Sequence, residues 1–406
     1  MKKNALYMGL IILLLSGCLI IINKKIDTIE KYVKEKGDAN SFNLKLLKEV
    51  NKDNHQNYLI SPYSIEIALA MVKDGATGTT HKEIAEVLPS RTIKNLNVKD
   101  RISTANALFI KNEYANSIKK TFINDIKSKY EGEVIYDDFV TPVAINNWVD
   151  DKTYHMIDKI LDNISDDFML GLANALAIDV EWEVPFECTS TGKEKFTTRD
   201  GVVYVEGMHE TLLDADYILE EDVKGIILPY KEYEGSNGEK INLEFIALMP
   251  EVDLNEYIDK LTDEELKNVL NYKKSLGANE ELRLMLPRFT YDYSITDFIK
   301  VLNNIGINSA FTPDAEFRNI TEISTYINTA IHKTHIELNE TGTKAAAVTF
   351  FGFTKSSLPV EKKYIDISFN KPFMYMIKDR ESGELLFVGT VYSPNKWQGS
   401  TCKSEE

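Results

Sequence analysis

The stretch of sequence that says most about the fold is NYLISPYSI at residues 57–65. It runs on into ALAM at 68–71 and GA at 75–76. Apolar residues recur at helical spacing from residue 64 to residue 73, which predicts a helix directly behind the motif. Residues 41–50 show the same spacing. The folded part of the chain is therefore expected to begin with helices.

Working outward from this motif, helical segments come first and strand-like segments become more frequent later. Residues 80–88 are predicted to form a helix, because Thr80 and Glu83 have the spacing of a capping box. Another helix is expected to open at 141–142 and to bury Trp148. Strands are predicted for residues 104–111, 172–182, 242–249, 281–289, 326–338, 373–378 and 385–392. This order favours an α+β fold over an alternating, doubly wound sheet.

Short motifs follow the opening one in order along the chain. They are NALF at 106–109, INNWV at 145–149, NA at 174–175, Trp182 with PF at 185–186, LPRF at 286–289, NKPF at 370–373 and LFVG at 386–389. Together with residues 57–65 they resemble the serpin family, and the resemblance covers roughly residues 39–394. It implies one α+β domain with three β-sheets, about nine helices and an exposed reactive-centre loop near the C-terminus.

The resemblance also implies a polar cluster beneath the central sheet, at the point where its strands part. Carried over by position, its members are Ser61, Ser64, Asn174 and His332, and Trp182 lies near the top of the same opening. These shutter and breach residues are expected to hold structure rather than to perform chemistry. His332 and His335 do not alternate correctly to share one strand face, so they do not predict a metal pair.

A segment of small residues near the C-terminus resembles the hinge of the family. It consists of Glu340, Gly342, Thr343, Lys344, Ala345, Ala346, Ala347, Val348 and Thr349. Small side chains behind a glycine can change from an exposed arm into a buried central strand without a steric penalty. If the loop inserts, strand alternation turns Thr343 inward and Lys344 outward. The family usually has glutamate at the position of Lys344, and this departure is expected to alter the rate of insertion only modestly.

Family spacing from Glu340 places the cleaved bond between Ser356 and Ser357, while a loop one residue shorter would place it between Lys355 and Ser356. The first bond suits a protease with a small specificity pocket, and the second suits a trypsin-like enzyme. Glu340 also matches the family position that pairs with a basic residue at the end of a neighbouring strand. Arg288 is the expected partner.

The N-terminus predicts an attachment to a membrane. Residues 1–23 begin with two lysines, continue through an apolar run and contain LSGC at 15–18, which is the pattern of a bacterial lipoprotein signal with Cys18 as the lipidation site. An uncleaved transmembrane anchor remains the alternative, since the apolar run approaches the length that spans a bilayer. Both readings place the protein on the extracellular face of the membrane. Residues 24–38 then form a charged spacer, 39–396 the folded domain and 397–406 a polar tail.

Composition limits the classes of partner and cofactor that the chain is expected to bind. A formal net charge of −16 argues against nucleic-acid binding, because phosphates would repel such a surface. The three cysteines are too few and too far apart for a disulfide framework or a zinc site, and we expect Cys188 and Cys402 to be free thiols. No cofactor and no metal are expected. The chain is expected to be a monomer. Its expected partner is a target protease held in a covalent acyl-enzyme complex.

The function implied by the resemblance is suicide inhibition of an extracellular serine or cysteine protease. The chain carries no GxSxG, HExxH or phosphate-binding GxxxxGK[ST] motif, so it is not expected to be an enzyme. The alternative is a non-inhibitory binding protein with the same fold, whose loop cannot insert. Bulky or proline-containing hinges mark that class, and residues 343–349 contain neither feature.

Overall fold

The computed structural model describes residues 39–52, 54–91, 95–272, 274–295, 297–343 and 362–399. The predicted anchor and the charged spacer therefore lie outside the described residues. Within the described ranges, no helix is long and apolar enough to cross a membrane.

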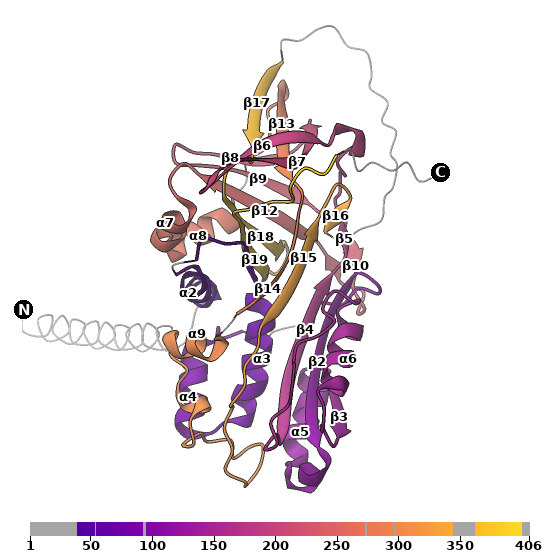
Figure 1. Cartoon of the computed structure of the whole chain (residues 1–406), viewed down its shortest axis with the longest axis vertical. Helices are drawn as coiled ribbons and strands as arrows, with labels where there is room; N and C mark the ends of the chain where they lie inside the picture. The colour runs from indigo at the N-terminus through magenta and orange to yellow at the C-terminus, as the bar shows by residue number, and fades with distance from the viewer. Residues whose placement is uncertain are drawn as a thin grey trace, which may run out of the picture.

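The helices of the described part gather mainly around the lower half of the molecule (Figure 1). They are α2 (Ala39–Asn51), α3 (Pro62–Gly75), α4 (Gly78–Val87), α5 (Lys120–Lys129), α6 (Val143–Lys152), α7 (Leu254–Lys260), α8 (Asp263–Leu270) and α9 (Phe298–Asn304), with short 3-10 helices η1 (Asn112–Ser117), η2 (Cys188–Ser190) and η3 (Ser309–Phe311). The helix behind the opening motif, α3, begins with Pro62, and the Oγ of Ser61 accepts a hydrogen bond from the Ser64 N–H at 3.1 Å. Ser61 thus satisfies one of the free amides of the first turn.

Two sheets form the upper and inner parts of the molecule (Figure 1). The buried one has the order β1 (Tyr58–Ile60), β19 (Leu385–Val391), β18 (Phe373–Asp379), β12 (Leu243–Pro250), β9 (Val223–Pro229) and β8 (Asp216–Leu219). The upper one has the order β17 (Lys363–Ser368), β13 (Glu280–Pro287), β7 (Gly201–Leu212) and β6 (Gly192–Thr198). A two-stranded ribbon pairs β10 (Tyr233–Glu234) with β11 (Lys240–Ile241). Strands β12, β18 and β19 are buried along their whole length, which makes their sheet the centre of the core.

The third sheet is split, and the split positions the candidate site. One half has the order β14 (Phe289–Ser294), β15 (Lys333–Leu338), β16 (Gly342–Thr343) and β5 (Val180–Glu181). The other half has the order β3 (Glu133–Asp137), β2 (Ile102–Lys111) and β4 (Leu170–Ile178). Since β4 and β5 are separated only by Asp179, the two halves meet at the top, where β16 lies between β5 and β15. Below β16, the described strands β4 and β15 form no ladder with each other.

Helix α6 covers one face of β2 and β4. Its Trp148 packs edge-on against Phe109 of β2, with ring centroids 5.6 Å apart, in a small apolar cluster separate from the main core. The burial of Trp148 that the sequence predicts is therefore confirmed.

A buried ionic cluster lies where α3 meets the turn between β18 and β19. The Nε of Arg91 donates to Glu66 at 3.0 Å, and the same guanidinium pairs with Glu384. Both carboxylates are buried, and Asp379 is a third buried carboxylate nearby. Burial raises the pKa of Glu384 to about 7, and the Arg91 guanidinium only partly offsets this effect.

The α+β prediction is confirmed. If the split sheet is taken as one, the expected three large sheets are present beside the β10–β11 ribbon. The predicted strand at 326–338 is only half correct, because β15 begins at Lys333 and residues 326–332 form no strand.

The predicted capping box at Thr80 and Glu83 is wrong. Helix α4 already begins at Gly78, so both residues lie inside it. Their side chains instead hold a distant segment: Thr80 Oγ1 accepts from the Glu316 N–H at 3.0 Å, and the Glu83 carboxylate accepts from the Ser309 N–H at 2.7 Å. Hydrogen bonds to the backbone of residues 309 and 316 have taken the place of the expected local capping bonds.

Candidate functional site: the loop insertion point and the slot below it

Residues Gly342 and Thr343 already occupy the top of the split sheet. Gly342 lies opposite Glu181, and Thr343 lies opposite Val180 on one side and Leu338 on the other. A Cβ atom at position 342 would lie 2.1 Å from the carbonyl oxygen of Val180. Only glycine fits this close approach of two backbones. The segment predicted to be a hinge therefore starts inside the sheet.

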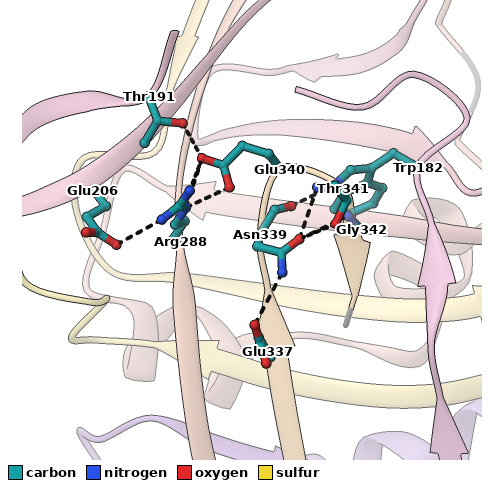
Figure 2. A network of polar contacts seen from close by, with 9 residues as sticks. All are labelled: Trp182, Thr191, Glu206, Arg288, Glu337, Asn339, Glu340, Thr341 and Gly342. Atoms are coloured by element: carbon teal, nitrogen blue, oxygen red, sulfur yellow. Dashed lines mark hydrogen bonds and ion pairs between the residues drawn. The ribbon is translucent and has the colours of Figure 1, made fainter. Parts of the chain in front are cut away.

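Hydrogen bonds made by Asn339 and Trp182 hold the turn before β16 in place (Figure 2). The Oδ1 of Asn339 accepts from the N–H of Thr341 at 3.0 Å and from its hydroxyl at 2.8 Å. The indole Nε1 of Trp182 donates to the carbonyl of Asn339 at 3.0 Å, and the Trp182 N–H donates to the carbonyl of Thr341 at 2.9 Å. Trp182 thus lies at the top of the split sheet, and both its backbone and its side chain donate hydrogen bonds to the turn.

The structure brings Arg288 and Glu340 together, as Figure 2 shows. The Nε of Arg288 donates to Glu340 Oε2 at 2.7 Å, while its Nη1 lies 3.5 Å from Glu206 Oε2. The hydroxyl of Thr191 donates to the Glu340 carboxylate as well. Both carboxylates are buried, so one guanidinium neutralises two desolvated charges. This network holds the turn from which the loop departs.

The side chain of Thr343 points inward, as strand alternation predicts. It is buried, and its Oγ1 lies 2.7 Å from the hydroxyl of Tyr230. The ring of Tyr230 stacks on Trp182 with an interplanar angle of 8° and a centroid distance of 4.5 Å. Burial raises the pKa of Tyr230 far above its ordinary value, so its hydroxyl stays protonated.

A small cavity of about 20 Å³, partly open to solvent, is lined by Thr343. Its two sides are formed by residues of β4 and β15, and the core sheet contributes Ile377 and Phe387. The segment after α6 closes it with Met156 and Ile157. The cavity lies between β4 and β15, whose facing edges form no ladder with each other among the described residues, and this unpaired region is called the slot.

The predicted shutter residues lie at the lower part of the same opening and form one connected network. The Nε2 of His332 accepts from the Ser61 N–H at 3.0 Å, and the hydroxyl of Ser64 donates to the Oδ1 of Asn174. The amide of Asn174 donates onward to Asn106 Oδ1 at 2.8 Å. His332 joins Asn174 through Ser61 and Ser64. The cluster thus links the residue just before β15 with α3, β4 and β2 across the slot.

His332 is held as a neutral acceptor. Its side chain is fully buried, and this burial lowers its pKa to about 4. Because Nε2 accepts a hydrogen bond from a backbone amide, the proton of the neutral ring lies on Nδ1. His332 is therefore expected to stay neutral, with one ring proton, near neutral pH.

The expectation of a free thiol at Cys188 is wrong, because Cys188 is disulfide-bonded. Its partner lies outside the described residues, as do Cys18 and Cys402. Several other predicted site residues also lie outside them, namely Lys344, Ala345, Ala346, Ala347, Val348, Thr349, Lys355, Ser356 and Ser357. Among the residues described, no group of three or more His, Cys, Asp or Glu side chains is placed to hold a metal ion.

Sequence reasoning missed several residues that contact the site. They are Asn106, Thr191, Glu206, Tyr230 and Asn339. Asn106 lies within the NALF motif and faces the same way as Thr104. Strand alternation in the sequence could therefore have indicated that Asn106 is buried. Asn339 directly precedes Glu340 at the start of the predicted hinge, whereas Thr191, Glu206 and Tyr230 reach the site across distances in sequence that no local pattern encodes.

Comparisons with known proteins agree on one family. A family model described as serpin (serine protease inhibitor) matches residues 38–394. An uncharacterized serpin-like protein of Thermococcus kodakarensis is 30% identical over 380 residues, which cover 87% of this chain and 84% of the relative. Alpha-1-antiproteinase S of Cavia porcellus is 29% identical over 375 residues, which cover 85% of this chain and 86% of the relative.

Solved structures show the same likeness. The thermophilic serpin tengpin in its native state is 31% identical, with a TM-score of 0.74 and coverage of 90% of this chain and 94% of tengpin. Thyroxine-binding globulin in complex with thyroxine is 23% identical, with a TM-score of 0.71 and coverage of 90% of this chain and all of the globulin. At that identity the second likeness shows the fold alone.

Proposed function

This chain belongs to the serpin family, and from that premise we propose that it is a suicide inhibitor of an extracellular serine protease, or of a cysteine protease with the same acyl chemistry. The target attacks the reactive loop and becomes bound to it as an acyl-enzyme. The freed loop then enters the slot as a new strand and carries the attached protease away before water completes the hydrolysis. The catalytic groups belong to the target.

One observation carries this proposal: the start of the loop is seated in the sheet at the top of the region where β4 and β15 form no ladder with each other. Gly342 and Thr343 pair with β5 and β15, and the cavity continues below them between β4 and β15. A strand that inserted there would part β4 and β15 and form hydrogen bonds with the inner edges of both. At about 0.5 to 1.5 kcal/mol net for each hydrogen bond, plus the burial of aromatic loop residues, the gain is on the order of 10 kcal/mol.

The chemistry of the hinge also favours insertion over the binding-protein alternative. Apart from Lys344, which strand alternation turns outward, the residues that follow Thr343 are small up to position 349, so they fit a buried strand without displacing their neighbours. Thyroxine-binding globulin shares the fold, but its likeness to this chain is too low to transfer binding of a ligand. The name alpha-1-antiproteinase, borne by a relative, agrees with the inhibitory proposal.

We place the inhibitor on the extracellular face of the membrane, as a monomer attached through Cys18 or through an uncleaved anchor. The disulfide bond of Cys188 supports this location, because disulfide bonds persist mainly in oxidising compartments.

The test incubates the purified full-length protein with a panel of serine and cysteine proteases. We expect an SDS-stable complex with at least one of them and a cleaved form that melts at a markedly higher temperature. The first residue of the released C-terminal peptide should be Ser357, or Ser356 if the loop is one residue shorter. Cleavage of the loop with neither complex nor a gain in melting temperature would refute inhibition and favour the binding-protein alternative.

Thr343→Arg separates cleavage from trapping. The variant puts a long charged side chain at the buried site beside Tyr230, where a charge without a partner is costly. It should be cleaved at the same bond as the wild type without forming the complex. Thr343→Ser is the matched control, since it keeps a small side chain and the hydroxyl, and it should still trap the protease.

A further inference from the structure

The residue that contacts Thr343, at the start of the loop, is Tyr230, and it follows a strand of the core sheet and not of the split sheet. Tyr230 directly follows β9 of the core sheet, and its N–H donates to the carbonyl of Leu243 at 3.0 Å. Its backbone also forms an isolated bridge with Trp182, and their rings are stacked. Backbone and ring contacts therefore hold the Tyr230 hydroxyl in place beside Thr343.

That hydroxyl meets the first inward-facing residue of the loop. The distance between Tyr230 OH and Thr343 Oγ1 is 2.7 Å, and both residues are buried. Among the described residues, the Tyr230 hydroxyl has no other hydrogen-bond partner. If Thr343 leaves the sheet, a buried hydroxyl loses its partner, and such groups are costly to leave unsatisfied.

We propose that Tyr230 is the positioning residue of loop insertion: its hydrogen bond to Thr343 keeps the hinge seated before any protease arrives and so sets the fraction of encounters that end in trapping. This inference rests on the proposed function and deepens it. Thr343 occupies the same position when insertion begins and when it is complete, because a strand that extends downward leaves its first residue in place. The bond therefore favours every inserted state over the state in which the hinge has left the sheet.

The size of the effect follows from one hydrogen bond. Removing the Tyr230 hydroxyl should raise the population of the expelled hinge roughly tenfold, the ratio that corresponds to the loss of a single buried hydrogen bond. Insertion then begins from the expelled state in a larger share of molecules, and more acyl-enzymes are hydrolysed before the loop enters. The rate of the first cleavage should not change, because Tyr230 is buried and does not contact the protease.

The experiment uses four variants of the full-length chain: Tyr230→Phe, Thr343→Val, the double variant and Tyr233→Phe. Tyr230→Phe keeps the ring that stacks on Trp182, so the fold is retained. Thr343→Val keeps the shape of the threonine and removes the same hydrogen bond from the other side. Tyr233→Phe is the matched control, because the Tyr233 hydroxyl accepts from the Glu181 N–H at 2.9 Å and does not touch the loop.

The first measurement needs no protease. Amide hydrogen exchange at residues 342–343 should be about tenfold faster in Tyr230→Phe and in Thr343→Val, no faster again in the double variant, and unchanged in Tyr233→Phe. Exchange in Tyr230→Phe equal to that of the wild type, or equal acceleration by Tyr233→Phe, would overturn the proposal. So would single effects that add in the double variant, because the two groups would then act independently.

The second measurement counts the inhibitor molecules consumed for each protease trapped. This number should rise in Tyr230→Phe and Thr343→Val, with the same cleaved bond and the same rate of first cleavage. An unchanged number in both variants would overturn the role of Tyr230 in trapping. If the wild type traps no protease at all, the proposed function fails, while the exchange experiment still decides whether Tyr230 seats the hinge.

Discussion

Arg288→Met and Glu340→Gln remove opposite ends of one ion pair, yet they should differ in cost. Arg288 lies between two buried carboxylates, Glu340 at 2.7 Å and Glu206 at 3.5 Å, and the side chains of both glutamates are only 7% exposed. Glu340→Gln leaves the guanidinium paired with Glu206, so it should lower the free energy of unfolding by about 1.5 to 3 kcal/mol. Arg288→Met leaves two desolvated carboxylates facing each other, and it should cost about 3 to 5 kcal/mol.

The assay is urea unfolding of the uncleaved protein, followed by circular dichroism, with the wild type measured in parallel. Arg283→Met is the control, because Arg283 and Asp366 form an ion pair whose side chains are 53% and 65% exposed. Its cost should stay below about 1 kcal/mol. The double variant Arg288→Met/Glu340→Gln should be more stable than Arg288→Met alone, since it removes one of the two uncompensated charges. If Arg288→Met costs no more than Glu340→Gln, the account of one cation serving two buried carboxylates is wrong.

Four further predictions test other parts of the structure. His332→Ala should lower the free energy of unfolding by about 1 to 3 kcal/mol, because it leaves the Ser61 N–H unpaired, and it should increase polymer formation on native gels after mild heating; a variant no more polymer-prone than the wild type would remove His332 from the gate. Glu384→Gln should stabilise the protein by about 1 to 3 kcal/mol at pH 8 and have little effect at pH 5, as measured by urea unfolding at both values. The sign follows from the raised pKa of Glu384, about 7: the folded state holds a proton that the unfolded state releases near pH 4.5, so stability is lost as pH rises between these values. Gly342→Ala should expel the hinge, since its Cβ would meet a backbone oxygen at 2.1 Å, and hydrogen exchange at Thr343 should accelerate; unchanged exchange would show that the hinge can seat without glycine. Cys18→Ser should abolish labelling by a fatty-acid analogue, and label that persists would point to another anchor.

Much of the site could be predicted because its residues lie in short motifs that a single stretch of sequence reveals. Ser61 and Ser64 belong to the opening motif, and alternation alone turns Thr343 inward. The pairing of Arg288 with Glu340 could be carried over by position, and the structure brings the two together. The identity of the cleaved bond stays a prediction, since it falls outside the described residues.

The rest could not be predicted, because it depends on contacts between segments far apart in sequence. Tyr230 is separated from Thr343 by 113 positions, and nothing around it indicates a polar role. Thr80 and Glu83 have the local spacing of a cap, but the chain near residues 309–316 offers backbone amides that compete for the same oxygens. The disulfide bond of Cys188 was missed because cysteine spacing says little about which thiols approach in space.

The unpaired region between β4 and β15 also limits how concentrated the protein can be before its molecules link to one another. A sheet normally keeps its open edges on the outside, where charges and bulges protect them, but here two edges face each other inside the molecule. Any extended segment of suitable side chains competes for that space. The loop of the same molecule competes at an effective concentration on the order of millimolar, set by its short connection, so a neighbour's loop in dilute solution is at a large disadvantage. Attachment to a membrane would crowd neighbours into a thin layer and reduce the advantage of the molecule's own loop over a neighbour's loop. The density of molecules on the surface, more than their total amount, would then decide when they begin to link to one another.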